Sequence, residues 1–200
     1  MRDAPLERLV RAIRERDRAL AFRLLAASPD LAKASFVSGA TRQAPKPYYA
    51  GDTALHAAAA IYDTATAHKL IAMGANVRAR NRRGAEPLHS AAVGQPGSET
   101  WDPAAQAETI AVLIAAGADP NATDMDEVTP LHRAVRTRCA AAVQALLEGG
   151  ADVRARNKNG SRPADLAARN TGRGGSGSME AKAQQQEILQ LLSSSGNPTR

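Results

Sequence analysis

The sequence predicts an all-α solenoid in which about five helix-turn-helix units stack side by side. One signature occurs three times, at residues 53–56 (Thr-Ala-Leu-His), 86–89 (Glu-Pro-Leu-His) and 129–132 (Thr-Pro-Leu-His), and a Gly-Ala pair follows each copy. Leu55 and Leu88, which hold the same place in two copies, are 33 residues apart. A fixed period of this length is typical of one supersecondary unit repeated along a stack.

The composition agrees with this architecture. Hydrophobic residues make up 44% of the 200-residue chain but aromatic residues only 3%. Most of the apolar content is alanine and leucine, as expected where thin helix pairs pack closely along a stack. The single cysteine, Cys139, excludes an intramolecular disulfide, and no Cys or His cluster has the spacing of a zinc site. We therefore expect no metal and no cofactor.

Targeting and membrane signals are missing from the sequence. The N-terminal stretch carries charges through residue 18 and lacks the apolar core of a signal peptide, and no run of 18 uncharged apolar residues occurs. We therefore expect a cytoplasmic protein that does not enter a membrane.

The net charge of +6 is unevenly distributed along the chain. Residues 1–83 carry a net +8, residues 84–132 carry −8 with no Lys or Arg, and residues 133–200 carry +6. The acidic middle would repel a uniform polyanion, so the pattern argues against nucleic acid and favours a protein as the partner. Binding of nucleic acid or another anionic surface by the two basic ends is the alternative.

The predicted elements follow the chain in order. Residues 5–36 fit two helices that form an N-terminal cap unit with a charged outer face. Glycine and prolines interrupt the pattern over residues 37–50, which predicts an inserted loop. Residues 51–83 form the first regular repeat. Residues 84–123 form the next repeat, with an inserted loop at 94–103 between its helices.

Regular spacing returns in the second half of the chain. Residues 124–156 form a repeat, and residues 157–193 form a divergent C-terminal cap unit that ends in an apolar helix. Residues 194–200 have no apolar periodicity, which predicts a disordered tail. Residues 5–193 are therefore expected to form a single domain.

The recurring residues have local chemical roles at helix ends. Thr53 and Thr129 stand where a helix begins, so their hydroxyl oxygens can accept from free N–H groups of the first turn. Pro87, Pro130 and Pro163 hold the first helical position, where a missing N–H costs nothing. A glycine in the left-handed conformation is expected to end each second helix.

These residues resemble the repeats of ankyrin-repeat proteins, whose Thr-Pro-Leu-His box and Leu-x-x-Gly-Ala helix exit they match. The resemblance covers residues 5–193 and is most specific in the three interior units. It implies units of a β-turn and two antiparallel helices, with the turns projecting as fingers beside a concave binding surface. It also implies that His56, His89 and His132 tie each helix start to a finger by hydrogen bonds. A shared metal site is disfavoured because each histidine lies in its own unit.

The chain departs from the family pattern at several positions. Glu86 and Arg162 replace the capping threonine, and Ala54 replaces the proline. Glu127 occupies the finger position that other units fill with glycine, as at Gly84. Because glycine tolerates a positive φ and glutamate does not, we expect the finger that contains Glu127 to be reshaped or strained.

Three of the six aromatic residues, Tyr48, Tyr49 and Trp101, lie in the two inserted loops. Large rings in exposed loops either anchor the loop on the solenoid or enter a pocket of a partner, since Trp and Tyr are enriched among interface anchors. Both interpretations stay open. The stability and the affinity of a Trp101 variant would separate them.

Finger tips form the second group of candidate binding residues. Their charges run basic, acidic, basic on fingers that the resemblance places side by side, and solvated surface charge is the plain alternative. Helix residues behind the fingers complete the concave wall by family analogy. The predicted partner-binding residues are Tyr48, Tyr49, Ile61, Arg80, Arg82, Arg83, Val93, Trp101, Met125, Asp126, Glu127, Arg136, Thr137, Arg156, Lys158 and Arg169.

Catalysis has little support in the sequence. Cys139 beside Arg138 is the one candidate nucleophile, with His132 as its base, but an inert small side chain is the favoured interpretation. The glycine-rich stretch at 172–177 lacks the lysine of a P-loop, and no Gly-x-Ser-x-Gly elbow occurs. We therefore expect a non-catalytic protein-binding module without a small-molecule substrate. An inhibitory or immunity-type role is one version of this function.

Overall fold

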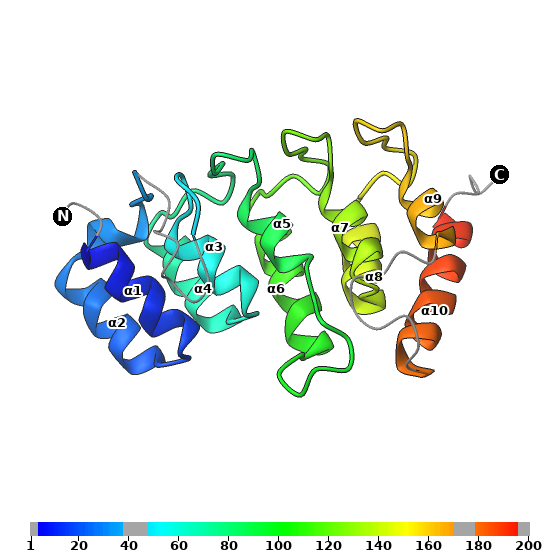
Figure 1. Cartoon of the computed structure of the whole chain (residues 1–200). Coiled ribbons are helices and arrows are strands. Elements are labelled where there is room, and N and C mark those ends of the chain that lie inside the picture. The colour runs from blue at the N-terminus through cyan, green and yellow to red at the C-terminus, as the bar shows by residue number, and fades with distance from the viewer. Residues whose placement is uncertain (1–3, 38–47, 170–178, 196–200) are drawn as a thin grey trace.

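The computed structural model describes residues 4–37, 48–169 and 179–195, and its helices stand side by side in a row (Figure 1). These residues contain no β-strand, only an isolated bridge between Ser35 and Thr53. The row confirms the predicted all-α solenoid. The elements are α1 (Ala4–Arg14), α2 (Arg18–Ala27), the 3-10 helix η1 (Pro29–Ala32), α3 (Ala54–Ala60), α4 (Thr64–Ala72), α5 (Pro87–Ala91), α6 (Pro103–Ala115), α7 (Pro130–Arg136), α8 (Ala140–Glu148), α9 (Pro163–Ala168) and α10 (Met179–Ser195).

Neighbouring helix pairs pack in two layers. The first helices α3, α5, α7 and α9 contact one another in succession, and so do the second helices α4, α6, α8 and α10. Leu55, Leu88 and Leu131, which come from the repeated signature, are all fully buried. They belong to one hydrophobic core that continues from Leu6 in α1 to Leu192 in α10. Each pair therefore buries its apolar side chains against its neighbours.

The first helices begin with the chemistry that the sequence predicts. Thr53 and Thr129 are N-caps, and each hydroxyl oxygen accepts a hydrogen bond from the N–H of the third helical residue at 3.4 Å. Pro87, Pro130 and Pro163 are the first residues of α5, α7 and α9. The glycines that follow α4, α6 and α8 all have a positive φ, with values of 85° at Gly74, 97° at Gly117 and 90° at Gly150.

The turn between the two helices of a pair contains a left-handed residue that the sequence did not predict. Arg16, Tyr62 and Arg138 have φ values of 59°, 58° and 58°. Each lies immediately before the residue that N-caps the second helix of its pair. Non-glycine residues adopt this conformation at a cost of about 1 kcal/mol or more, so the surrounding turn must hold it in place. The repeated geometry shows that three pairs turn in the same way.

The third pair differs because a long segment separates its helices. Residues 92–102 connect α5 to α6 and form the extended loop at the bottom of Figure 1. Pro103, which we predicted to lie in the insertion, is the first residue of α6, because Asp102 caps that helix by accepting from the N–H groups of Ala104 and Ala105 at 3.0 Å. Part of the insertion therefore lengthens the second helix, which has 13 residues where α4 and α8 have nine each.

Several sequence predictions fall outside the described residues. They concern most of the first inserted loop, at 38–47, the segment 170–178 and the end of the predicted tail, at 196–200. Within the described part of the chain, the helices are too short or too polar for any of them to cross a membrane.

Candidate partner-binding surface

The loops at the top of Figure 1 are fingers with the same internal hydrogen bonds. In the first of them, the side-chain oxygen of Asn81 accepts from the N–H groups of Arg83 at 2.9 Å and Ala85 at 3.1 Å. An Asn or Asp side chain that bonds to the backbone beyond it stabilises a tight turn. Asp124 and Asn157 make the equivalent pairs of bonds in the next two fingers.

Backbone hydrogen bonds also join each finger to the next. The N–H of Arg82 donates to the Ala50 carbonyl at 2.7 Å. The N–H of Met125 donates to the Arg83 carbonyl at 2.9 Å, and that of Lys158 donates to the Asp126 carbonyl at 3.0 Å. The finger tips therefore stand side by side in a fixed register. We call the surface formed by the fingers and the adjoining sides of α1, α3, α5 and α7 the inner face.

The finger that contains Glu127 keeps the shape of its neighbours. Glu127 has a φ of 56°, and the glycines at the matching positions, Gly84 and Gly160, have φ values of 75° and 73°. Its N–H donates to the Asp124 carbonyl at 3.0 Å, just as the two glycines donate within their own fingers. The expected reshaping is therefore wrong, whereas the left-handed conformation of a non-glycine residue is present.

The three buried histidines connect successive units. In His56, Nδ1 accepts from the backbone N–H of Thr53 at 3.1 Å, and Nε2 lies 3.1 Å from the Ala85 carbonyl at the end of the next finger. Because a backbone N–H can only donate, Nδ1 must be the acceptor, and the proton must sit on Nε2, which donates to the carbonyl. His89 and His132 make the same pair of contacts, with the Val128 and Ser161 carbonyls at 3.0 and 2.9 Å.

Burial keeps these imidazoles in the neutral form. Desolvation lowers the pKa of His56 and of His132, and it lowers the pKa of His89 to about 4. Both ring nitrogens of each histidine are engaged by the backbone. The histidines therefore hold helix starts and fingers together, as the family resemblance implies.

Some of the charged side chains predicted to bind a partner contact groups of the solenoid itself. The Arg80 guanidinium donates to the Gly84 carbonyl at 3.1 Å and to the Thr123 carbonyl of the next finger at 2.6 Å. Arg83 lies 3.7 Å from the Asp126 carboxylate, so a basic finger pairs with an acidic one. Exposed pairs of this kind add little stability, and the charges remain accessible from solvent.

The other predicted residues of the fingers and helices lie at varied depths. Met125 is the most open apolar side chain at a finger tip, with 68% of its surface exposed, and Val93 is 38% exposed. Thr137 is half-buried, and its hydroxyl donates to the Arg133 carbonyl at 3.0 Å. Ile61 is also half-buried, whereas the exposed members of the group are Arg82, Glu127, Arg136, Arg156, Lys158 and Arg169.

The aromatic residues of the two insertions contact the solenoid. The Tyr48 ring stacks on Phe36 with centroids 3.7 Å apart, and the Tyr48 hydroxyl donates to Glu7 at 2.9 Å. The half-buried Trp101 donates through Nε1 to Gln106 at 2.9 Å. These contacts are those of loop anchors. A role of the same rings in partner binding stays a prediction.

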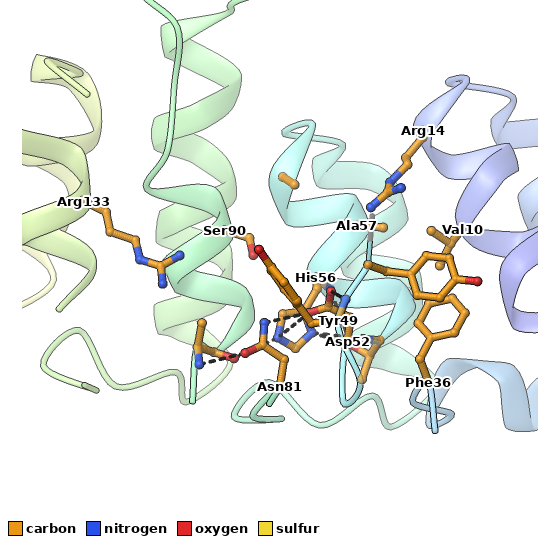
Figure 2. Close-up of a pocket in the computed structure, with 14 residues that line it drawn as sticks. Val10, Arg14, Phe36, Tyr49, Asp52, His56, Ala57, Asn81, Ser90 and Arg133 are labelled. Atoms are coloured by element: carbon orange, nitrogen blue, oxygen red, sulfur yellow. Dashed lines mark hydrogen bonds and ion pairs between the residues drawn. The ribbon is translucent and has the colours of Figure 1, made fainter. Parts of the chain in front are cut away.

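A hollow of about 190 Å³ lies on the inner face beside the end of the first insertion. Arg14 from α1, Ser90 from α5 and Arg133 from α7 line it together with Tyr48 and Tyr49. Figure 2 shows Arg14 and Arg133 at opposite ends of the lining group, with the Tyr49 ring between them. Sequence reasoning missed Arg14, Ser90 and Arg133 because they come from three separate units and belong to no motif.

Cys139 is the N-cap residue of α8, at the turn that follows α7, and it lies beside Gly94 of the second insertion. Its thiol is fully buried, and burial raises its pKa. A Cβ added at Gly94 would collide with the Cys139 sulfur, so the loop backbone runs directly against this side chain. The predicted base, His132, has both ring nitrogens bound to the backbone. The surroundings of Cys139 are those of a packed side chain and not of an activated nucleophile.

Comparison with known proteins identifies the repeats. The model of the family described as ankyrin repeats (many copies) matches residues 113–167, and the ankyrin repeat model matches residues 50–82. Protein fem-1 homolog A of Bos taurus is 35% identical over 81 residues, which cover 39% of this chain and 12% of the relative. Ankyrin repeat and SOCS box protein 16 of Mus musculus is 36% identical over 96 residues, which cover 47% of this chain and 20% of the relative.

A third relative is E3 ubiquitin-protein ligase KEG of Arabidopsis thaliana, which is 37% identical over 100 residues, covering 50% of this chain and 6% of the relative. The chain thus spans a fifth or less of the length of these relatives. The matched repeats, the stacked helical pairs and the histidines that join each helix to the next finger make this chain a member of the ankyrin-repeat family.

Proposed function

We propose that the chain is a non-catalytic module that binds a protein partner through its concave inner face, its finger tips and its two inserted loops. Ankyrin repeats generally serve as protein-protein interaction modules. An inhibitory or immunity-type role is a special case of this proposal, in which the bound partner loses its activity.

The observation that carries the proposal is the fixed register of the finger tips. Hydrogen bonds from Arg82 to Ala50, from Met125 to Arg83 and from Lys158 to Asp126 hold the backbone of each tip against the next. A surface that is rigid before binding loses little conformational entropy when a partner docks on it. The side chains at the tips can then differ in chemistry while their positions stay constant.

The chemistry of the tips fits a protein surface. Met125, with 68% of its side chain exposed, lies between the exposed arginine Arg82 of one finger and Lys158 of the next. Specific interfaces combine an apolar centre with a polar rim of this kind. Because the charges run basic, acidic, basic, a partner with the opposite order would be steered into register.

Reversing a charge at one finger tip tests the proposal. A protein partner is first isolated by affinity capture with the wild type. We then expect Arg82→Glu to slow association with this captured partner about tenfold, since charge complementarity acts mainly on the association rate. Arg23→Glu is the matched control, because Arg23 is also exposed but lies on α2, away from the fingers. Arg80 is unsuitable because its guanidinium braces the next finger. Equal rates for the Arg82 variant and the wild type would contradict the proposal.

The basic N-terminal unit favours a second candidate function. Arg8, Arg11 and Arg23 are exposed on α1 and α2, and such a patch can bind phosphates of a nucleic acid. Several phosphate contacts make the logarithm of the affinity fall steeply with the logarithm of the salt concentration. A steep slope with an oligonucleotide, reduced in Arg8→Gln, would support this candidate over protein binding.

A further inference from the structure

The hollow on the inner face has a composition that points to a particular ligand. The end of the first insertion, at Tyr48 and Tyr49, forms one wall, and residues of α1, α3, α5 and α7 line the hollow together with Phe36, Asp52, Thr53, Asn81 and Ala85. Ala57 and Ala60 of α3 lie at its apolar part, together with Val10 of α1. The hollow therefore exists because an irregular segment closes part of the face that regular units leave open.

The size of the hollow fits an aromatic ring. An apolar cavity of about 150 Å³ in another protein is large enough to hold benzene. The hollow here measures about 190 Å³ and carries aromatic and alanine side chains beside polar groups. Tyr48 is held by its stacking on Phe36, and Tyr49 lies 5.1 Å below the Arg82 guanidinium. Both rings are therefore fixed in place before a ligand arrives.

The charges around the hollow are predominantly positive. Arg14 and Arg133 line it, and Arg82 lies over the Tyr49 ring at its edge. The lining carboxylate of Asp52 is already bound, since its two oxygens accept from the Asn81 amide at 2.9 Å and from the Tyr49 N–H at 2.7 Å. Burial also lowers the pKa of the Arg14 guanidinium, and an added anion would oppose that effect.

The arginines at the two ends of the hollow are both half-buried. Arg133 donates from one terminal nitrogen to the Asp124 carboxylate at 2.8 Å, while its buried Nε has no hydrogen-bond partner among the described residues. Arg14 is half-buried at the end of α1. A guanidinium has several donors in a fixed fork, so each arginine can take a carboxylate in addition to its existing contacts.

We propose that the hollow receives one aromatic side chain from an acidic segment of the protein partner, whose carboxylates pair with Arg14 and Arg133. This inference rests on the proposed protein-binding function and specifies the partner's chemistry. A short acidic segment suits the site better than a nucleic acid does, because Asp124, Asp126 and Glu127 of the adjoining finger would repel a continuous polyanion. A few carboxylates placed beside one ring avoid that repulsion.

An array of short peptides tests this inference without knowledge of the natural partner. The peptides vary the central residue through all amino-acid types and carry acidic, neutral or basic flanks. We expect the labelled protein to favour a central Phe, Tyr or Trp within acidic flanks. The dissociation constants of the selected peptide and of its central Ala version are then measured by fluorescence anisotropy, with an expected difference of about tenfold or more.

Two pairs of protein variants locate the binding event. Ala60→Trp fills the hollow from the exposed end of α3, and Ala72→Trp is its control at the exposed end of α4. Arg14→Gln removes a lining charge, and Arg11→Gln removes an exposed charge from the same helix. We expect about a tenfold loss of peptide affinity in the first member of each pair and no loss in its control.

Each alternative result has a defined meaning. Selection of acidic peptides regardless of the central residue, no selection at all, or unchanged affinity in Ala60→Trp would overturn the inference. Preferential binding of an oligonucleotide that Ala60→Trp weakens would also overturn it. Protein binding through the finger tips fails on a different result, namely equal association rates for Arg82→Glu and the wild type. If Arg82→Glu slows association with the captured partner while Ala60→Trp leaves it unchanged, the inner face binds the partner without using the hollow.

Discussion

The third helical pair and the pairs on either side of it reach the same spatial register by different means. The pairs α3/α4 and α7/α8 each have helices of seven and nine residues, whereas α5 and α6 have five and 13. His89 nevertheless makes the same contacts as His56 and His132. The helix start and the following finger therefore set the spacing between units, and helix length is free to vary.

The third pair also places an unusual group at its helix start. Glu86 replaces the capping threonine, and only 2% of its surface is exposed. Its Oε2 atom has no hydrogen-bond partner within the described residues, and Arg78 lies 3.8 Å from its Oε1 atom. Burial raises the pKa of this carboxyl. The third pair thus keeps the geometry of its neighbours but buries a carboxylate that is only partly compensated. Four measurements would test this contrast between the third pair and the regular pairs.

The largest expected effect is a loss of stability in acid through the histidines. The pKa of His89 falls from 6.5 in the unfolded chain to about 4 in the fold. The unfolded state therefore binds a proton first, and about 3 kcal/mol of unfolding free energy disappears as the pH falls through this window. His56 and His132 act in the same direction because burial lowers their pKa too. Urea unfolding between neutral pH and about pH 4 measures the loss.

A His89→Gln variant isolates the contribution of the third pair. Its stability should fall less steeply with acid than that of the wild type, because one titrating group is missing. His68→Gln, on the exposed side of α4, is the control for replacing a histidine by glutamine. Parallel curves for wild type and His89→Gln would show that His89 does not titrate in this way.

Removing the ring that anchors the second insertion should have the next largest effect. Trp101→Ala loses a half-buried ring and leaves the side-chain oxygen of Gln106 without its donor. We expect a loss of about 2 kcal/mol in unfolding free energy, measured by chemical denaturation. Gln95→Ala, exposed in the same loop, should change little. Unchanged stability combined with lost partner binding would instead assign Trp101 to the interface.

Restoring the regular cap should stabilise the third pair. Glu86→Thr removes a buried carboxylate and gives α5 a capping hydroxyl like those of Thr53 and Thr129 at the starts of α3 and α7. We therefore expect a gain of about 1 kcal/mol in unfolding free energy at neutral pH. The gain should shrink in acid, because a carboxyl with a raised pKa becomes neutral there and its burial no longer costs free energy. Thr129→Glu, the reverse change in a regular pair, should destabilise. A loss of stability in Glu86→Thr would show that the contact with Arg78 outweighs the burial.

The smallest expected effect concerns the finger that follows the third pair. Glu127→Gly removes a non-glycine residue from a φ of 56° and should stabilise the protein by less than about 1 kcal/mol, since added freedom in the unfolded chain offsets part of the gain. Lys158→Gly, at a finger tip without a positive φ, should destabilise slightly. The difference in melting temperature between the two variants is the measurement, and equal shifts would contradict strain at Glu127.

Prediction from the sequence succeeded where short-range chemistry decides the structure. Thr53 and Pro130 mark helix starts because a cap and a fixed φ act within one turn of helix. The boundary at Pro103 was missed because this proline was counted with the glycine and prolines of the loop, whereas Asp102 caps α6 and makes Pro103 its first residue. Nothing in the sequence indicated the left-handed φ of Tyr62, because tyrosine does not favour this conformation and only the surrounding structure holds it there.

The amino-acid sequence by itself determined the repeat, the helix starts and the apolar stripe of each unit, because these depend on neighbours within a few residues. Only the stacked structure decided that Arg80 braces the next finger, that Glu86 is buried, and that Arg14 and Arg133 line one hollow. Burial and pairing of groups from different units depend on how the units pack. That packing sums many weak contacts along the whole row, and no local pattern of residues encodes it.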